Sequence, residues 1–226
     1  ELAVMSHQRA AAATADGRLA MEIAPWFGGR GMDQVIDSDN LIRPETSLDA
    51  LAKLKPVFDR TYGSVTAGNA SALTDGAATT LLMSEEKAHA LGYRPLTAIR
   101  AYAVAAVDPG WQLLMGPAYA VPIALKRAGI SWNDLGLVEI HEAFASQVLS
   151  NVQAWGSADW ARRLGLPGVV GEVDWSRTNV MGGSATGARL VTSLSNEMAR
   201  RDVQFGLISI CAQGGMGFAM VLERVG

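Results

Sequence analysis

The chemically most informative side chain in this sequence is its single cysteine, Cys211, which lies in a glycine-rich stretch, Ile210–Gly217 (ICAQGGMG). Apolar runs at Phe205–Ile210 and Phe218–Leu222 flank it, and this pattern predicts two strands joined by a tight turn. A thiol beside such a turn can stand close to backbone N–H groups, which suits acyl transfer or proton transfer. Cysteines without a catalytic task are also common in protein cores, so this residue alone leaves both interpretations open.

A second candidate is the sequence HEAF, His141–Phe144, which directly follows an apolar run at Leu137–Ile140. The run predicts a strand, and the ends of strands in α/β folds are where ligands gather. A histidine there can donate a hydrogen bond from one ring nitrogen while Glu142 or the backbone orients the ring. A His–Glu pair at a helix start without any task fits the same pattern. A zincin motif, HExxH, is excluded because position 145 is alanine, and three histidines with one cysteine give a metal site little support.

Three further segments carry weaker chemical signals. Asn179–Ser184 (NVMGGS) predicts a Gly-Gly turn. Thr66–Ala77 (TAGNASALTDGA) is small and polar, which would let its backbone approach a long, thin ligand. Arg43 could contact a phosphate, although an isolated arginine is usually only solvated. Each of these patterns is also typical of ordinary loops.

Alternating strand and helix patterns must position these groups, and they predict an α/β fold. The expected helices are Leu2–Leu19, Ser84–Leu91, Pro117–Ala128, His141–Ala154 and Ala188–Arg200, and the expected buried strands include Leu96–Val107 and Leu137–Ile140. Gly76–Met83 (GAATTLLM) is expected to form a buried strand or the start of a helix. The irregular composition of Glu22–Lys55 and Trp155–Trp175 favours excursions over the surface.

The composition limits the class of protein. The 226 residues are 49% hydrophobic and 18% charged, with a net charge of −3, which allows a substantial core and argues against nucleic-acid binding. A single cysteine excludes a disulfide framework and favours a reducing, cytoplasmic compartment. No apolar run reaches the roughly 18 residues that a membrane helix needs, and the first residues show no signal-peptide pattern.

Several motifs occur in a fixed order along the sequence. They are SHQRAAAA (Ser6–Ala13), IRPETSLDALAKLKPVFD (Ile42–Asp59), GSVTAGNASALTDGAA (Gly63–Ala78), HEAFA (His141–Ala145), NVMGGS (Asn179–Ser184) and CAQGGMGFAMVLE (Cys211–Glu223). In these motifs and their order the sequence resembles the thiolase family over essentially its whole length. HEAF stands where many thiolases have NEAF, and with LLMGPAYA at Leu113–Ala120 it makes the chain most similar to the β-subunits of fatty-acid β-oxidation complexes.

The resemblance implies a layered αβαβα thiolase fold, of which this chain would contain the C-terminal half (residues 63–226) and the end of the loop, or lid, domain (residues 1–62). It implies thiolytic cleavage of 3-ketoacyl-CoA by CoA to acetyl-CoA and a shortened acyl-CoA, the acyl-transfer step of fatty-acid β-oxidation. No metal or prosthetic group is implied, because CoA is a substrate. The implied protein partners are a second thiolase subunit and an α-subunit with hydratase and dehydrogenase activities.

The resemblance also implies roles for individual residues. Cys211 matches the cysteine that exchanges protons with the acetyl carbanion, and His141 matches the residue that holds a water in an oxyanion hole. The backbone N–H of Gln213 matches the donor of a second oxyanion hole. The residues that match CoA contacts are Arg43, Ala67, Ser71 and Phe144, with Arg43 at the nucleotide phosphates and Ser71 with its small neighbours at the pantetheine arm. For its acid/base role, Cys211 is expected to have a pKa that N–H dipoles and an imidazole bring near working pH.

Two departures from the family pattern concern the catalytic groups. Thiolases are longer, are built from two similar halves, and carry their nucleophilic cysteine in the half that would precede this sequence. At Ser184–Ala185 the sequence runs from GGS directly into ATGAR, where the family has a loop with the GHP histidine that activates the nucleophile. We therefore interpret the sequence as part of a longer thiolase. The alternative is a catalytically inactive thiolase-like scaffold or CoA-binding subunit.

Overall fold

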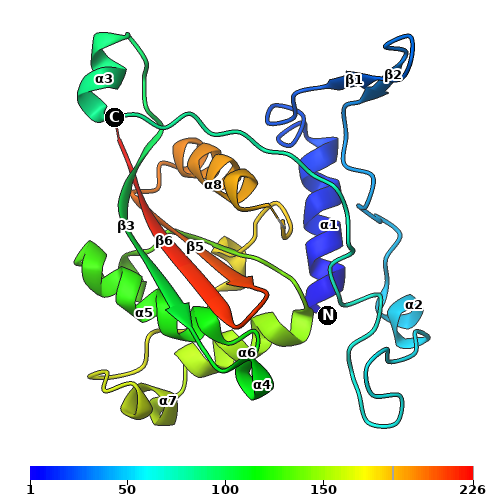
Figure 1. Ribbon diagram of the computed structural model, residues 1–226, viewed down its shortest axis with the longest axis vertical. Coiled ribbons are helices and arrows are strands. Elements are labelled where there is room, and N and C mark those ends of the chain that lie inside the picture. The colour runs from blue at the N-terminus through cyan, green and yellow to red at the C-terminus, as the bar shows by residue number, and fades with distance from the viewer. Residues whose placement is uncertain (185, 226) are drawn as a thin grey trace.

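The computed structural model of the chain describes residues 1–184 and 186–225, and its centre is a mixed four-stranded sheet (Figure 1). The strands are β3 (Thr97–Ala106), β4 (Leu137–Ile140), β5 (Phe205–Ala212) and β6 (Met216–Arg224), and their order across the sheet is β3-β6-β5-β4. β5 and β6 form the predicted hairpin, whereas β4 runs parallel to β5. The carboxyl ends of β4 and β5 therefore lie at the same end of the sheet.

Helices cover both faces of this sheet. α5 (Gly116–Ala128) and α6 (Ala145–Trp155) pack on one face, and α8 (Gly187–Arg201) packs on the other. Because alternate residues of a strand point to opposite faces, Val138 and Leu137 of β4 belong to two separate apolar clusters. The alternating strand and helix patterns thus produce the predicted α/β fold.

Several helix boundaries follow directly from local sequence signals. α3 (Glu85–Ala90) begins after Ser84, whose hydroxyl accepts a hydrogen bond from the Lys87 backbone N–H at 3.2 Å. α5 has Pro117 in its first turn and ends at Gly129, which adopts the left-handed φ of 73° that glycine tolerates. These ends match the predicted ones to within a residue or two.

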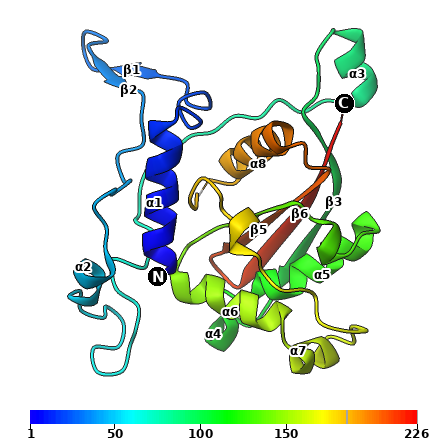
Figure 2. The same cartoon turned by 180° about the vertical axis from the view of Figure 1, so that it is seen from behind.

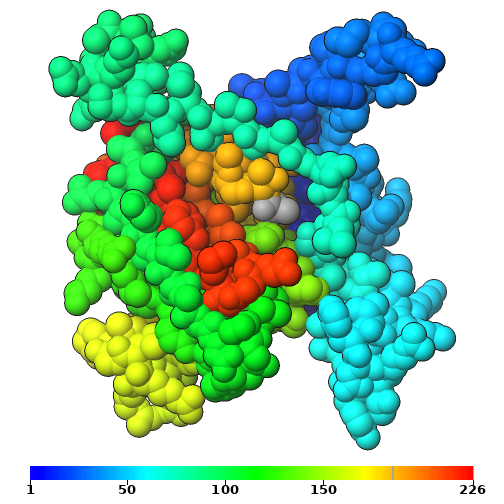
Figure 3. All heavy atoms as spheres, in the orientation of Figure 1, coloured from blue at the N-terminus to red at the C-terminus, as the bar shows by residue number. Residues whose placement is uncertain are grey.

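Residues 16–84, which follow α1 (Leu2–Ala15), run outside the sheet and are called the excursion below. Their short elements are β1 (Trp26–Gly28), β2 (Gln34–Ile36) and α2 (Leu48–Ala52). Both ribbon views place α1 between the sheet with its helices and this part of the excursion (Figures 1 and 2). In the space-filling view, the dark blue and cyan parts of the excursion project as separate arms (Figure 3). The predicted surface path of Glu22–Lys55 is thus confirmed.

The remaining elements are short. They are the α-helices α4 (Pro109–Gln112) and α7 (Ala158–Arg163) and the 3-10 helices Trp132–Asp134 and Trp175–Arg177. Within the part of the chain that the structure describes, no helix is both long and apolar enough to cross a membrane.

Three local predictions were wrong. Gly76–Met83 forms neither strand nor helix, and Leu81 is 71% exposed. β3 is a strand as predicted, but one of its faces is open, because Tyr102 and Val104 are exposed. The helix expected from His141 begins only at Ala145, because Phe144 is extended and forms a β-bridge with Ala70. In each case the tertiary context decided the outcome against the local pattern: Gly76–Met83 and one face of β3 are not covered by other elements of the described chain, and Phe144 pairs with Ala70.

Candidate active site

Cys211 and His141 lie side by side at the carboxyl ends of two parallel strands. Cys211 is near the end of β5, and His141 directly follows β4, where its backbone N–H donates to the Ser209 carbonyl at 2.8 Å. The Nδ1 atom of His141 is 3.2 Å from the Cys211 carbonyl oxygen and 3.9 Å from the Cys211 sulfur. A carbonyl oxygen can only accept, so Nδ1 carries the hydrogen and Nε2 of the neutral ring is left as an acceptor.

Burial dominates the electrostatics of this pair. It lowers the pKa of the His141 imidazole, although the hydrogen bond to the Cys211 carbonyl opposes this, and the ring is neutral at neutral pH. Burial also raises the pKa of the Cys211 thiol to about 11, with a smaller opposing contribution from a backbone hydrogen bond. The expectation of a pKa near working pH is therefore wrong for this chain, because burial favours the neutral thiol, and the neutral imidazole adds no positive charge that would stabilise a thiolate.

The turn after Cys211 places Gln213 at the exposed tip of the β5–β6 hairpin. Gly214 and Gly215 both adopt left-handed backbone conformations, with φ of 86° and 80°. A side chain on Gly215 would collide with the Val107 carbonyl, so glycine is required there on both counts. Gln213 is thus close to Cys211 in the chain, and its backbone belongs to a turn with tightly restricted geometry.

The small, polar segment around Ala67 and Ser71 lies directly against HEAF. The Ser71 N–H donates to the Ala143 carbonyl at 2.8 Å, and the Ala145 N–H donates to the Asn69 carbonyl at 2.9 Å. The Asn69 side chain also closes its own turn, since its Oδ1 accepts from the Thr66 N–H at 2.9 Å. Ala67 lies within this turn.

Two other contacts connect the predicted CoA-binding residues to neighbouring elements. The Phe144 ring meets the Phe58 ring edge-on, with centroids 6.2 Å apart. Arg43 is anchored on α1, because its backbone N–H donates to Nδ1 of His7 at 3.3 Å. The structure therefore joins Ala67, Ser71 and Phe144 to the segment that carries His141, and it attaches Arg43 to α1 instead.

A residue that sequence reasoning did not single out, Asn179, contacts the same segment. It is 2% exposed, and its side chain bonds both backbone groups of Ile140 and the carboxyl of Glu142. Burial raises the pKa of Glu142, against the opposing effects of hydrogen bonds with Ser6 and Asn179. The sequence signal that could have identified Asn179 is its residue type at the start of NVMGG, because asparagine is enriched at positive φ. Asn179 indeed has a φ of 48°.

The gap in the family pattern at Ser184–Ala185 falls partly on residue 185, which lies outside the described residues. Across residues 1–184 and 186–225, His, Cys, Asp and Glu side chains form no group of three or more that could hold a metal ion.

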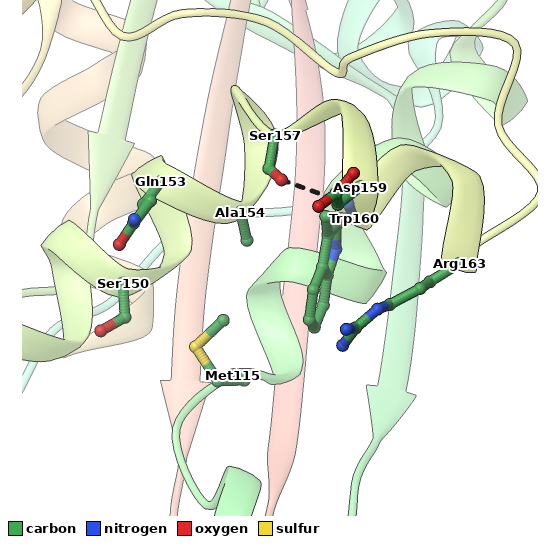
Figure 4. Close-up of a pocket in the computed structure, with 8 residues that line it drawn as sticks. All are labelled: Met115, Ser150, Gln153, Ala154, Ser157, Asp159, Trp160 and Arg163. Carbon is green, nitrogen blue, oxygen red and sulfur yellow. Dashed lines mark hydrogen bonds between the residues drawn. The ribbon is translucent and has the colours of Figure 1, made fainter.

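A pocket of about 330 Å³ lies away from these groups, between α6, α7 and the start of α5 (Figure 4). Trp160 and Arg163 of α7 point toward Met115 in Figure 4, and Ser157 caps α7 by accepting from the Trp160 N–H. The other lining residues are Ser150, Gln153, Ala154 and Asp159. None of the predicted site residues lines this pocket.

Comparison with known proteins places the chain in a family. The family described as "Thiolase, N-terminal domain" matches residues 1–86, and "Thiolase, C-terminal domain" matches residues 93–224. The chain is 48% identical over 231 residues to a 3-ketoacyl-CoA thiolase of Escherichia coli O157:H7, covering 98% of the chain and 53% of that relative. It is 52% identical over 200 residues to a 3-ketoacyl-CoA thiolase of Shewanella amazonensis, covering 84% of the chain and 46% of the relative.

Solved structures agree with these sequence matches. The acetyl-CoA acetyltransferase of Bacillus anthracis matches with a TM-score of 0.85 and 37% identity, covering 100% of this chain and 55% of that one. Human mitochondrial 3-ketoacyl-CoA thiolase matches with a TM-score of 0.80 and 35% identity, covering 99% and 54%. The chain spans about half the length of the curated relatives it matches. The predicted thiolase fold is confirmed, and the chain belongs to the thiolase family.

Proposed function

We propose that the chain is part of a 3-ketoacyl-CoA thiolase, an acetyl-CoA C-acyltransferase that cleaves 3-ketoacyl-CoA with CoA to acetyl-CoA and a shortened acyl-CoA. The observation that carries the proposal is the placement of the Cys211 thiol 3.9 Å from His141 Nδ1 at the ends of β5 and β4. The names of the curated relatives support the same reaction. In domain terms, residues 1–62 would belong to the loop domain and residues 63–226 to the C-terminal half.

Cys211 would act as the acid/base group of this reaction. The nucleophilic cysteine expected in the preceding half would bond to the β-carbonyl carbon, and the electron pair of the bond between the α- and β-carbons would go to the α-carbon of acetyl-CoA. That carbanion takes the thiol proton of Cys211, and a thiolate remains, while the shortened acyl group stays on the nucleophilic cysteine as a thioester. That thiolate then accepts the proton of the incoming CoA thiol, whose sulfur attacks the acyl thioester. The shortened acyl-CoA forms, the nucleophilic cysteine is released, and the Cys211 thiol is restored. A pKa of about 11 keeps the proton on sulfur until a base as strong as the carbanion forms.

His141 and Gln213 would stabilise negative charge on oxygen. Because Nδ1 of His141 donates to the Cys211 carbonyl, Nε2 can accept a hydrogen bond from a water, and the other hydrogen of that water can point to the enolate oxygen. The Gln213 N–H would serve the thioester oxygen of the acyl intermediate.

CoA would lie along the segment that packs against HEAF. Ala67, Ser71 and Phe144 would contact the pantetheine arm, and Arg43 would contact the nucleotide phosphates. A solved structure of human mitochondrial 3-ketoacyl-CoA thiolase in complex with CoA supports CoA as the ligand of the family. We further propose a role in fatty-acid β-oxidation in a reducing, cytoplasmic compartment, with a second thiolase subunit and an α-subunit carrying hydratase and dehydrogenase activities as partners.

An intact-mass measurement on the protein from its native cells is the first test. The 226-residue chain has a mass of 23.9 kDa, and the proposal expects a species about twice as heavy because the chain covers 53% of a relative. A native species at 23.9 kDa would contradict the proposal and favour the inactive scaffold or CoA-binding subunit.

Thiolysis assays on that native protein are the second test. Cys211→Ala should lower kcat by about 100- to 10,000-fold, the usual contribution of a general acid or base. Ile208→Val, a conservative change at a buried position of the same strand, is the matched control and should leave kcat unchanged. An inactive wild type that Cys211→Ala does not change would refute the enzyme assignment.

A further inference from the structure

We propose that Asn179 is a positioning residue for His141, because one carboxamide holds the residues on both sides of that histidine. This inference rests on the function proposed above for His141. Asn179 itself contacts neither His141 nor Cys211 through the hydrogen bonds of its side chain, which go to Ile140 and Glu142. Its effect would therefore be exerted through the backbone and carboxyl group that flank the imidazole-bearing residue.

The side chain of Asn179 completes the free edge of β4. Its Oδ1 accepts from the Ile140 N–H at 2.7 Å, and its Nδ2 donates to the Ile140 carbonyl at 2.9 Å. These are the two bonds that a residue of a neighbouring strand would make. The preceding residue, Thr178, forms a parallel β-bridge with Val138, so the carboxamide takes over where backbone pairing ends. The chain is thus held on this edge up to the residue before His141.

The second hydrogen of Nδ2 holds the residue after His141. It is donated to Oε1 of Glu142 at 2.5 Å, which leaves both amide hydrogens and the carbonyl oxygen of Asn179 engaged. The carboxyl of Glu142 is in turn hydrogen-bonded to the Ser6 hydroxyl, and that hydroxyl accepts a hydrogen bond from the Gly183 N–H at 3.0 Å. A side chain at Gly183 would collide with the Glu142 carboxyl, so glycine is required for this close approach.

The backbone of Asn179 is itself fixed independently of any ligand. Its φ of 48° lies in the left-handed region, which asparagine tolerates better than most residues. The Arg9 guanidinium of α1 donates to the Trp175 and Thr178 carbonyls, both at 2.6 Å. The Asn179 N–H donates to the Val138 carbonyl at 2.9 Å. A carboxamide held this firmly can set the geometry of the segment it binds.

The test is the tautomer of the His141 ring, read from its two ring ¹⁵N signals by NMR, with His7 and His89 as internal references. In the wild type, the hydrogen should reside on Nδ1, because Nδ1 faces the Cys211 carbonyl. Asn179→Asp keeps the size of the side chain but replaces the donor by an oxygen facing the Ile140 carbonyl and the Glu142 carboxyl. It should shift the His141 hydrogen from Nδ1 toward Nε2.

Asn151→Asp is the matched control. Asn151 is also fully buried and also makes three hydrogen bonds, to the Ala118 N–H and to the Leu114 and Gln147 carbonyls. It should lower thermal stability comparably while leaving the His141 signals unchanged. If Asn179→Asp folds and leaves the tautomer unchanged, or if Asn151→Asp shifts it equally, the inference is overturned.

If Asn179→Asp does not fold, Asn179→Gly decides by the same criterion, because glycine accepts the positive φ and removes only the carboxamide. In thiolysis assays on the native protein, Asn179→Gly should lower kcat by about 10- to 100-fold with little change in KM, as expected for a displaced catalytic group. The NMR result does not depend on turnover. If the wild-type protein shows no thiolysis but the Asn179 variant still shifts the His141 tautomer, the proposed function alone is refuted. If the wild type is active and the tautomer does not change in the variant, the positioning role alone is refuted.

Discussion

The sheet with its helices and the excursion, residues 16–84, are stabilised in different ways. In the sheet region, both central strands are covered on both faces, and Leu207 and Ile208 of β5 are almost completely buried. In the excursion, many large apolar side chains remain exposed, including Trp26, Phe58 and Leu73. A segment that buries so little apolar surface cannot hold its own fold by the hydrophobic effect.

The excursion is attached to α8 by polar contacts and by a few apolar side chains, because Leu19, Ile23 and Ile42 join the apolar cluster that contains Leu190 of α8. Arg189 forms a two-pronged ion pair with Asp39, and Glu22 accepts from the Ser193 hydroxyl at 2.6 Å. The Asp39–Arg189 ion pair is partly exposed, and such pairs contribute far less than packed apolar side chains. The comparison teaches that the sheet region determines its own structure, whereas the position of the excursion depends on its attachments to α8 and to the segment that follows His141.

The largest expected effect separates the two regions by stability. Leu207→Ala removes a fully buried side chain from β5 and should lower the free energy of unfolding by about 2–5 kcal/mol. Leu81→Ala, at a 71% exposed position of the excursion, should change it by less than about 0.5 kcal/mol. Urea denaturation followed by circular dichroism measures both. Equal losses for the two variants would show that the excursion contributes a core of its own.

The second prediction separates the regions by thiol reactivity. The folded Cys211 thiol, with a pKa of about 11 against an ordinary 9.0, should hold about 100-fold less thiolate than an unperturbed cysteine at pH 8. Iodoacetamide should therefore alkylate it slowly, whereas a cysteine introduced as Ala72→Cys in the exposed excursion should react at the ordinary rate. Fast alkylation of native Cys211 would contradict its burial.

The raised pKa of Cys211 also has a consequence for stability. The contribution of the protonated thiol to the free energy of unfolding should be complete below pH 9.0 and be lost as pH rises through about 11.

The third prediction concerns Glu197 of α8, whose carboxyl also pairs with the Arg18 guanidinium of the excursion at 3.5 Å. Burial raises its pKa, but hydrogen bonds from Arg201 at 2.7 Å and Arg200 at 2.8 Å outweigh burial, and the pKa lies below its ordinary 4.5. The contribution of the Glu197 carboxylate to the free energy of unfolding should be present above pH 4.5. It should be lost as pH falls through the lowered pKa of the folded state. Glu197→Gln should cost about 1.5–3 kcal/mol at pH 7, measured by urea denaturation, and flatten the acid limb of the stability profile. An unchanged acid limb would exclude Glu197 as its source.

The smallest expected effect is at the Asp39–Arg189 ion pair. Asp39→Asn should lower the global free energy of unfolding by less than about 1 kcal/mol, because the pair is half-exposed. Hydrogen exchange of residues 34–43 should nevertheless accelerate, since the excursion loses one of its attachments. Asp37→Asn, at an exposed position two residues earlier, is the control and should leave this exchange unchanged. Equal exchange in wild type and Asp39→Asn would mean that other contacts hold this segment.

Local chemistry made some of the structure predictable from the sequence. The β5–β6 hairpin follows from two apolar runs around Gly214 and Gly215, and the end of α5 follows from Gly129. The α/β alternation and the ordered thiolase motifs likewise needed no coordinates. Cys211, His141 and the segment around Ser71 were identified as site candidates because each carries a residue type suited to the chemistry in a recognisable local pattern.

Only the tertiary structure decided how these pieces work together. The non-helical conformation of His141–Phe144 accompanies the pairing of Phe144 with Ala70 and the bonding of Ile140 by Asn179, which is 39 residues away in the chain. The raised pKa of Cys211 depends on its burial, which leaves the residue 3% exposed. Sequence patterns report contacts within a turn or a strand. Desolvation and long-range hydrogen bonds arise only when distant segments pack together, so the sequence alone determined which groups are present, and tertiary packing determined their protonation and orientation.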